Sequence, residues 1–425
     1  MDVGIGAYEA TLRWLYEIEV ARGWDLKLES VRRALAVLGD PHTRYPSLHV
    51  AGTNGKGSTA AIAHSVLGRI GVKAGLYTSP HLSDFTERIR IGDQPIGRDD
   101  VVRLAAHVRA AVEPAGVELT FFELATVLAF VAFAEARVDA AVVEVGLGGR
   151  LDATNVIVPR ASIVTTIAHD HESWLGDTVA AIAAEKGGII KPGVPLVVGR
   201  VDEEAAAVLA GIAAERRSPL RRLGRDFEGR PAGDGFDYRG RRAIRGLRLG
   251  LRGAFQIDNA AVALAGLEEG GWLDAAGDEP IRDGVVEVCW PGRLEVVRRE
   301  PLVIVDGAHN PAAAAAVARE IPAIAGGRDV HLVFGVLRDK RWESMAEALA
   351  PVIADAIVVP VAERRSADPT DVARAFAARV PTRTSHSAEA ALTELLEAPS
   401  ARSGAVLVTG SLFLVGEVRE WLARR

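Results

Sequence analysis

The sequence predicts an α/β protein with two domains: a large N-terminal P-loop ATPase-like domain with a mostly parallel sheet, and a smaller C-terminal Rossmann-like α/β domain. Three observations predict this class. Apolar strand patterns alternate with helical patterns between residues 48 and 198. A glycine-rich loop, GTNGKG, separates the first of these strands from the next helix. The alternation starts again after a Pro-Gly turn near Arg293, which indicates a second core.

The composition favours a globular protein with two domains and small-molecule partners. A chain of 425 residues has room for two cores, and 49% apolar with 25% charged residues is ordinary for a globular protein. The net charge of −6 lacks the basic excess of a nucleic-acid-binding domain, so small-molecule partners are favoured and no nucleic acid is expected. The single cysteine, Cys289, excludes an intrachain disulfide and a cysteine-rich metal site.

The N-terminal stretch, MDVGIGAYEATLRWLYE, is amphipathic and acidic, unlike a basic segment followed by an apolar core. No apolar run in the chain reaches the length that spans a membrane. We therefore expect a cytoplasmic protein without a membrane partner.

The first strand and the loop after it predict a nucleotide triphosphate site. Leu48–Ala51 reads as a buried strand, and Ser58 and Thr59 open an alanine-rich helix. Glycines let backbone N–H groups approach phosphate oxygens, the helix N-terminus adds positive potential, and a lysine supplies a charge. The predicted ATP contacts in this loop are Thr53, Asn54, Gly55, Lys56, Gly57 and Ser58. Only two residues separate Gly52 from the Gly-Lys pair, where the common pattern has four, and an ordinary glycine-rich turn with an exposed lysine is the alternative.

The remaining elements of the first domain follow from periodicity. Helical spacing recurs over residues 7–38, 101–112, 121–136 and 177–186, the last with Asp177 as its N-cap. Apolar runs predict strands at 73–78, 138–145, 162–167 and 195–198. Ligands of such sheets bind at the carboxyl ends of the strands. We therefore expect the polar residues at four strand ends to converge: Lys56 with Ser58, Ser79, Glu144 and His171.

Glu144 is the best candidate ligand for magnesium, because Mg²⁺ bridges phosphate oxygens and takes few protein ligands. A salt-bridge or helix-cap role is the alternative for Glu144, and a surface or structural role for His171.

The second half begins with an arginine- and glycine-rich stretch, residues 216–252, which predicts a small β-excursion with a solvated face. A nucleic-acid patch is the alternative, but regularly interleaved aromatic residues are missing from the stretch. A helix is predicted from Asn259. Beyond Arg293, strands are predicted at 302–305, 331–334, 356–361 and 405–408.

Ten motifs, in order, carry a family resemblance: HVAGTNGKGS, TSPHLSDFTERI, TFFE, EVGLGGRLDATN, DHESWLGDT, EKGGIIKPG, FQIDNA, WPGR, DGAHNP and TGSLF. Together they closely resemble the folylpolyglutamate synthase and dihydrofolate synthase family of the Mur ligase superfamily. The resemblance implies an ATP- and magnesium-dependent ligase. In such an enzyme a folate or dihydropteroate carboxylate accepts the γ-phosphoryl group, and the amine of L-glutamate attacks the acyl phosphate.

The resemblance also implies roles by position. Lys56 and Ser58 would hold the triphosphate, while Ser79, Glu144 and His171 would bind magnesium. Other residues would contact the nucleotide (Asn259, Arg293 and Asp306), the glutamate (His309 and Ser411) and the pterin (Thr120, Phe122 and Asp152). The implied domains are residues 1–293, an ATP-binding domain of the Mur ligase central type, and residues 294–425, a glutamate ligase domain.

Lys186 occupies the position of a lysine that is carbamylated by CO₂ in this family, which would make it a catalytic residue and a magnesium ligand alongside Lys56, Glu144 and His171. An exposed helix-terminal lysine is the alternative from sequence alone. The chain departs from the family pattern at Gly187, where alanine is usual, and at Arg341, where Asp339-Lys340 is usually followed by aspartate.

The sequence is also compatible with two other functions. One is a Mur-type amide ligase for another carboxylate, such as a peptidoglycan precursor, against which TFFE and LDATN argue. The other is a nucleotide-binding protein that has lost catalysis, against which the intact Lys56, Glu144, His171 and Lys186 argue. The resemblance favours a monomer.

Overall fold

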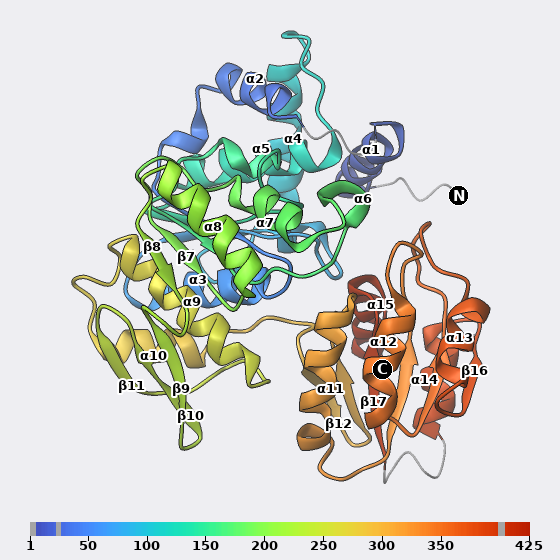
Figure 1. The fold of residues 1–425 in the computed structure, drawn as a ribbon. Coiled ribbons are helices and arrows are strands. Elements are labelled where there is room, and N and C mark those ends of the chain that lie inside the picture. Colours follow the sequence, from blue (N-terminus) through green and yellow to red (C-terminus); the bar gives the residue numbers. More distant parts are fainter. Residues whose placement is uncertain (1–5, 23–26, 398–403) are drawn as a thin grey trace. The chain divides into compact units, whose positions relative to one another are not determined.

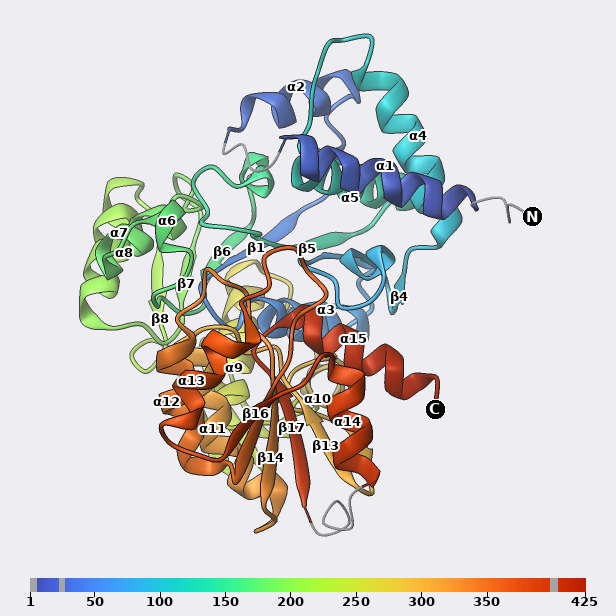
Figure 2. The same ribbon diagram turned by 90° about the vertical axis from the view of Figure 1, so that its right-hand side faces the viewer.

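The computed structural model describes residues 6–22, 27–397 and 404–425, which fold into two compact units (Figures 1 and 2). Unit 1 comprises Met1–Ile167, Trp174–Gly250 and Ile257–Val288; unit 2 comprises Ala168–Ser173, Leu251–Gln256 and Cys289–Arg425. The domains predicted from the sequence, residues 1–293 and 294–425, are each one continuous stretch of chain, whereas both units are discontinuous. The predicted limits stay a prediction. Two short segments from the first 256 residues belong to unit 2.

In its described part, unit 1 is built on an eight-stranded sheet in the order β4-β3-β2-β5-β1-β6-β7-β8. The six neighbouring strands β2, β5, β1, β6, β7 and β8 pair in parallel. The edge strand β4 pairs antiparallel with β3, and β3 pairs antiparallel with β2. The fold class predicted from the sequence is therefore confirmed for this unit. The strands are β1 (Ser47–Ala51), β2 (Ala74–Tyr77), β3 (Ile89–Ile91), β4 (Gln94–Pro95), β5 (Ala140–Glu144), β6 (Ala161–Val164), β7 (Leu196–Val198) and β8 (Leu220–Arg222).

Helices cover both faces of this sheet, as Figure 2 shows. One face carries α1 (Ala7–Arg22), α2 (Glu29–Val37), α4 (Arg98–Val112), α5 (Phe121–Ala136), α7 (Val179–Gly187) and α8 (Glu203–Glu215). The other face carries α3 (Lys56–Arg69), the main part of α9 (Phe255–Glu269) and α10 (Asp278–Val286). The central strands β1 and β5 are buried along their whole length, because both of their faces are covered.

Local signals explain where the helices begin. Thr120 and Glu123 form a reciprocal capping box at the start of α5, whose predicted bounds match those observed. For α7 the predicted cap was one residue early: the Thr178 side chain, not that of Asp177, accepts the Ala181 N–H. Helix α9 begins at Phe255, ahead of the predicted Asn259.

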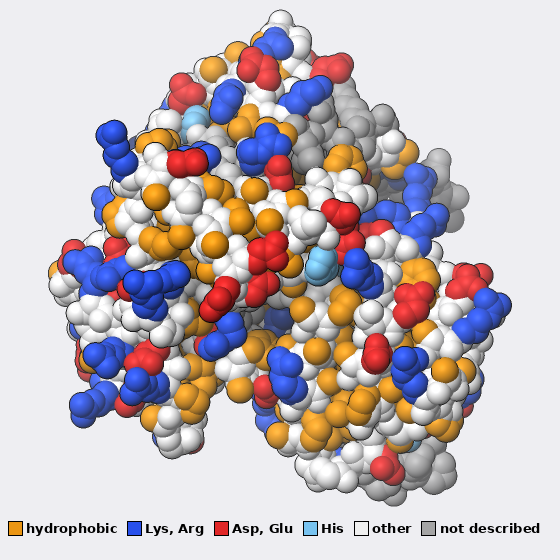
Figure 3. All heavy atoms as spheres, viewed as in Figure 1, with side chains coloured by type: hydrophobic (Ala, Val, Ile, Leu, Met, Phe, Trp, Pro, Cys, Tyr) orange, Lys and Arg blue, Asp and Glu red, His pale blue; other side chains and the backbone are white. Residues whose placement is uncertain are grey.

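The arginine-rich stretch forms the predicted small sheet, with the strands β9 (Glu228–Ala232), β10 (Gly235–Arg239) and β11 (Ala243–Leu247). Several of its arginines face carboxylates: Arg230 pairs with Glu228, Arg242 with Asp278, and Arg248 with Asp234. Figure 3 shows basic and acidic side chains interspersed over this part of unit 1. These arginines therefore lie on a solvated, charge-paired surface.

Unit 2 contains a six-stranded sheet within its described residues, in the order β12-β13-β17-β14-β15-β16, parallel except for the edge strand β12. The strands are β12 (Glu295–Arg299), β13 (Leu302–Val305), β14 (Val330–Phe334), β15 (Asp355–Val358), β16 (Thr382–Thr384) and β17 (Ala405–Thr409). Figure 2 shows helices on both faces of this sheet: α11 (Pro311–Ala325), α12 (Trp342–Leu349) and α13 (Pro369–Ala377) on one, α14 (Ala388–Glu397) and α15 (Leu412–Ala423) on the other. A short helix, α6 (Glu172–Leu175), begins in the segment of unit 2 that precedes Trp174.

Among the described helices, none combines the length and the apolar character that crossing a membrane requires.

A polar contact attaches helix α1 to the loop after β2. The Tyr8 hydroxyl donates to Asp84 Oδ1 at 2.6 Å, and Arg98 donates to Asp84 Oδ2 at 2.7 Å. Burial alone would raise the pKa of Asp84, but the hydrogen bonds from Tyr8, Thr86 and Arg98 outweigh it and lower the pKa to about 2. Asp84 is therefore ionised at neutral pH and holds α1 in place.

We expect Asp84→Asn to destabilise the protein at neutral pH and to matter progressively less in acid. A carboxylate with a depressed native pKa stabilises the fold fully above its unfolded value of 3.8, and this contribution disappears as the pH falls towards about 2. Urea unfolding of wild type and variant between pH 6 and pH 2.5 measures the difference. Asp99→Asn, which removes an exposed carboxylate from α4, is the control; a difference that is constant with pH would contradict the assignment.

Candidate active site

The glycine-rich loop connects β1 to α3 as the sequence predicts. Helix α3 begins at Lys56, with Gly55 in a left-handed conformation as its N-cap, so the backbone N–H groups of its first turn are directed at the loop. The end of β6 holds the other side of the loop: Thr166 Oγ1 accepts the Asn54 N–H at 2.9 Å, and Thr165 Oγ1 donates to the Asn54 carbonyl at 2.7 Å. This geometry suits an anion at the helix N-terminus.

Two loop positions require glycine. Gly52 has a φ of +146°, and a Cβ atom there would lie 1.9 Å from Thr165 Oγ1. Gly55 has a φ of +85°, and a Cβ atom there would lie 2.5 Å from Asn259 Oδ1. Any side chain would push the loop away from β6 and α9. The loop is thus held close to its neighbours directly before the N-terminus of α3, which fits a nucleotide triphosphate.

Two lysines meet at one carbonyl oxygen of this loop. Lys56 Nζ donates to the Gly52 carbonyl at 3.0 Å, and Lys186 Nζ, from the end of α7, donates to the same oxygen at 3.0 Å. Lys56 also donates to the Thr53 carbonyl at 3.1 Å. Lys186 is 5% exposed, which contradicts the picture of an exposed helix-terminal lysine. Two lysine side chains, from α3 and from α7, therefore meet at the start of the phosphate loop.

The ends of β2 and β5 lie side by side next to β1. The buried Glu144 ends β5, and its Oε2 accepts the Ser79 N–H at 3.2 Å just beyond β2. The hydroxyl of Ser79 and the carboxylate of Glu144 supply the hard oxygen atoms that magnesium prefers. No cluster of three or more His, Cys, Asp or Glu side chains suited to a metal occurs in the described residues. These two oxygen donors fit the ligand preference of magnesium.

The three residues predicted to contact the pterin, Thr120, Phe122 and Asp152, all lie in unit 1, and each makes structural contacts with neighbouring residues. Thr120 caps α5, and Phe122, in the first turn of α5, packs so closely on Gly146 that a Cβ atom there would lie 2.4 Å from its ring. Asp152 is buried, and its oxygens accept the N–H groups of Leu147 and Thr154. Burial raises the pKa of Asp152, although these hydrogen bonds favour its charged form. Contact with a substrate stays a prediction for all three.

The predicted nucleotide contacts belong to both units. Asn259, on α9 of unit 1, lies beside Gly55, as the position of its Oδ1 atom shows. In unit 2, Asp306 accepts the Leu294 N–H and the Ala308 N–H, both at 2.8 Å, and burial raises its pKa. Arg293 Nη1 donates to the Gly292 carbonyl at 3.1 Å. Asp306 therefore organises the WPGR turn and the loop after β13.

The remaining predicted residues lie in unit 2. Ser411 caps α15, where its hydroxyl accepts the Phe413 N–H at 3.2 Å. His309 lies with its Nδ1 atom 2.8 Å from the Gly307 carbonyl, so Nδ1 carries the proton. His171 belongs to the segment Ala168–Ser173 and therefore lies in unit 2, whereas Glu144 and Ser79 lie in unit 1. Each unit thus holds part of the predicted site.

Sequence reasoning missed four polar residues in these regions. Thr165 and Thr166 hold the phosphate loop, and a polar pair directly after a buried strand was the available signal. Asp170 and Lys340 form an ion pair at 2.7 Å with exposures of 8% and 5%. The two residues are 170 positions apart in the sequence, so no local pattern can indicate their contact.

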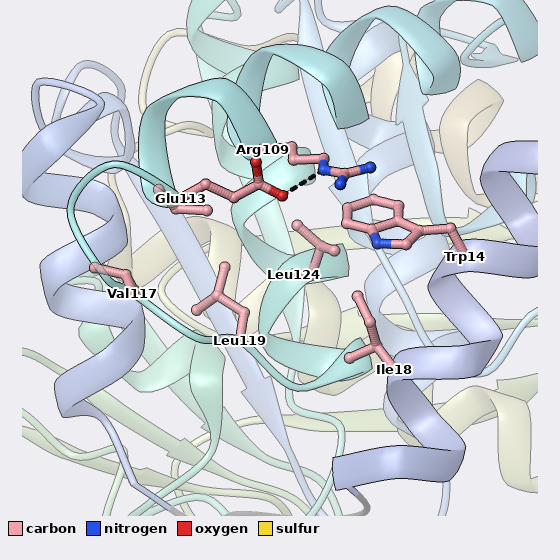
Figure 4. Close-up of a pocket in the computed structure, with 8 residues that line it drawn as sticks. Trp14, Ile18, Arg109, Glu113, Val117, Leu119 and Leu124 are labelled. Carbon is pink, nitrogen blue, oxygen red and sulfur yellow. Dashed lines mark hydrogen bonds and ion pairs between the residues drawn. The ribbon is translucent and has the colours of Figure 1, made fainter.

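A pocket of about 130 Å³ lies between α1, α4 and the start of α5 (Figure 4). Its lining is Trp14, Ile18, Arg109, Val112, Glu113, Val117, Leu119 and Leu124. Figure 4 shows the Arg109 and Glu113 side chains, one turn apart at the C-terminal end of α4, directed at each other along one edge of the pocket. None of the predicted site residues lines this pocket.

Comparison with known proteins assigns families to both halves of the chain. Residues 50–267 match the Mur ligase middle domain, and residues 292–412 match the Mur ligase, glutamate ligase domain. A dihydrofolate synthase/folylpolyglutamate synthase from Bacillus subtilis is 32% identical over 98% of this chain and 99% of its own length. A folylpolyglutamate synthase from Lacticaseibacillus casei is 36% identical, over 91% of this chain and 92% of its own length.

Solved structures give the same result. Mycobacterium tuberculosis folylpolyglutamate synthase complexed with ADP superposes with a TM-score of 0.90 at 31% identity, covering 99% of this chain and 100% of that one. Escherichia coli FolC in complex with DHPP and ADP also superposes with a TM-score of 0.90, at 33% identity, over 98% of both chains.

Proposed function

Because this chain belongs to the folylpolyglutamate synthase and dihydrofolate synthase family of the Mur ligase superfamily, we propose that it is an ATP-dependent ligase for L-glutamate. Its second substrate is the carboxylate of a folate or of dihydropteroate, and the reaction passes through an acyl phosphate. The observation that carries the proposal is full-length similarity together with a phosphate loop whose backbone and two lysines fit a triphosphate.

The loop residues have defined parts in this reaction. The N–H groups at the start of α3 and the Lys56 ammonium bind and orient the phosphates, so that the γ-phosphoryl group faces the carboxylate. Glu144 and Ser79 would hold magnesium, which supplies positive charge to the phosphoryl oxygens when bound. Phe122 and its neighbours would exclude water from the acyl phosphate, which hydrolyses readily.

The proposal includes carbamylation of Lys186. Two ammonium groups on the Gly52 carbonyl repel each other, and a carbamate on Lys186 removes this repulsion. A carbamylated Nζ keeps one N–H, so it can still donate to Gly52. Its two new oxygens are hard ligands of the kind that magnesium accepts.

Unit 2 would supply the glutamate side of the reaction through His309 and Ser411. The predicted roles of His171 as a magnesium ligand, and of Asn259, Arg293 and Asp306 as nucleotide contacts, belong to the same proposal. It also keeps the predicted monomeric state and the predicted cytoplasmic location.

Product mass tests the proposed function. The enzyme is incubated with ATP, magnesium and glutamate, and with either dihydropteroate or tetrahydrofolate. A gain of one glutamate residue on the first acid identifies dihydrofolate synthase activity, and a gain on the second identifies folylpolyglutamate synthase activity. ADP release is followed in parallel. Failure to add glutamate to any pteroate or folate would contradict the proposal.

We expect His309→Ala to raise the KM for glutamate by about tenfold or more, because a hydrogen bond to a charged group contributes about 1.5–3 kcal/mol. The KM for ATP should change far less, since His309 lies in the unit without the phosphate loop. Initial rates at varied glutamate and ATP measure both constants. His386→Ala, an exposed histidine of unit 2, is the control, and equal rises in both constants would place His309 elsewhere in the reaction.

A further inference from the structure

The segment Ala168–Ser173 belongs to unit 2, although the residues on both sides of it belong to unit 1. It follows β6, and Thr165 and Thr166 after this strand hold the phosphate loop. It precedes α7, which carries Lys186. The chain therefore connects this segment, in both directions, to elements that form the phosphate site.

Asp170 anchors the segment to unit 2. Its Oδ1 atom accepts from Lys340 Nζ at 2.7 Å and from the His171 N–H at 3.0 Å. Its Oδ2 atom accepts from Asn310 Nδ2 at 3.2 Å and lies 3.5 Å from His309 Nε2. The Asp170 carboxylate thus binds groups from two other parts of the chain, the loop after β13 and the loop after β14.

His171 is held in a conformation that it would not adopt alone. Its φ of +52° lies in the left-handed region, which costs free energy for any residue with a Cβ atom. The bond from its N–H to Asp170 offsets this cost. Its Nε2 atom lies 3.3 Å from Lys340 Nζ and accepts from that ammonium group, because Lys340 can only donate.

We propose that Asp170 and Lys340 are a positioning pair for the ligase reaction: their ion pair fixes Ala168–Ser173 on unit 2 and thereby sets the orientations of His171 and His309. Neither member needs to touch a substrate. The inference rests on the proposed function, because it is there that His171 and His309 act.

A second ion pair joins the same two segments and provides a matched comparison. Arg341, next to Lys340, pairs with Glu172 at 2.7 Å, with side-chain exposures of 55% and 26%. This contact gives a partner to the arginine that stands where the family usually has aspartate. Exposed ion pairs contribute little to the stability of a fold. Removing one partner of a buried pair, in contrast, leaves an uncompensated buried charge, which is strongly destabilising. Only the Asp170–Lys340 pair should therefore control the segment.

The test compares Lys340→Met, Lys340→Arg and the control Arg341→Gln in the full-length protein. Lys340→Met should lower kcat on the order of 100-fold, the usual consequence of a displaced catalytic group. The dissociation constant for ATP measured without magnesium should stay unchanged, because the phosphate loop is intact. Lys340→Arg keeps the charge and should recover part of the lost kcat. Arg341→Gln should behave as wild type.

Hydrogen exchange provides a readout that does not depend on turnover. Amides of residues 168–173 should lose protection in Lys340→Met and keep it in Arg341→Gln, while protection of the unit 2 sheet is retained in both. If Lys340→Met does not fold, Asp170→Asn replaces it, since the amide has the shape of the carboxylate without its charge.

Wild-type kcat in Lys340→Met, unchanged protection of residues 168–173, or an ATP dissociation constant that rises as much as kcat falls would each overturn the inference. Absence of turnover by the wild-type protein in the same assay would instead contradict the proposed function, and the exchange comparison would still decide the inference.

Discussion

Lys56→Ala is expected to lose turnover by a factor on the order of 100 to 1,000, the usual cost of removing a donor that stabilises charge in a transition state. In the structure this ammonium donates to the carbonyls of Gly52 and Thr53 at the start of the phosphate loop. Its charge is therefore held where the phosphates of ATP are proposed to bind. ADP release with dihydropteroate and glutamate measures the loss.

The fold should survive this substitution. Lys56 is half-buried, and its two bonds are to backbone carbonyl groups of the adjacent loop rather than to the core of unit 1. We therefore expect a small decrease in Tm, well below what a loss of folding would produce. Lys73→Ala is the matched control, because Lys73 also donates to a backbone carbonyl, that of Ala136, but on an exposed surface. Near-normal turnover in Lys56→Ala would show that the loop does not hold the triphosphate.

The central part of the fold could be predicted because its signals are local. A buried apolar run, three glycines and an alanine-rich helix identify β1, the phosphate loop and α3 without any knowledge of distant residues. Thr120 and Glu123 mark the start of α5 in the same way, since both halves of a capping box lie within one turn.

Other elements carry no such signal. The edge strands β12 and β16 were not predicted, because their residues are half-buried or exposed and lack an apolar alternation. The assignment of Ala168–Ser173 to unit 2 depends on Asp170, Lys340 and Asn310, whose contacts span more than 100 residues of chain. The family resemblance names His171 as a site residue, which stays a prediction, whereas its neighbours in space follow only from the structure.

The two lysines at Gly52 show the same limit within the active site. Lys56 was predicted from the loop itself, and Lys186 from the family resemblance alone. That both donate to one carbonyl oxygen follows only from the packing of α7 against the end of β1. The proposed carbamylation of Lys186 would therefore change the charge directly beside the Lys56 ammonium group.

Lys186→Ala is expected to lose most of the activity, on the order of 100- to 1,000-fold in kcat. If Lys186 acts as a carbamate, its loss removes two oxygen ligands from the magnesium site, and a bare alanine cannot replace them. A short carboxylic acid such as acetate, added to the medium, should restore part of kcat by occupying the vacated space. Bicarbonate should restore none, because CO₂ has no amine to modify.

The wild-type protein should behave in the opposite way. Preparation in CO₂-free buffer should lower its activity, and bicarbonate should recover it, because carbamylation is reversible. Lys191→Ala is the control: Lys191 follows α7 closely and donates to the Asn155 carbonyl, away from Gly52. A crystal structure of the active protein should show additional density on Lys186 Nζ. An unmodified amine in that structure, together with an active Lys186→Ala variant, would leave Lys186 with the one role that the present geometry gives it, a buried donor that closes the phosphate loop through Gly52.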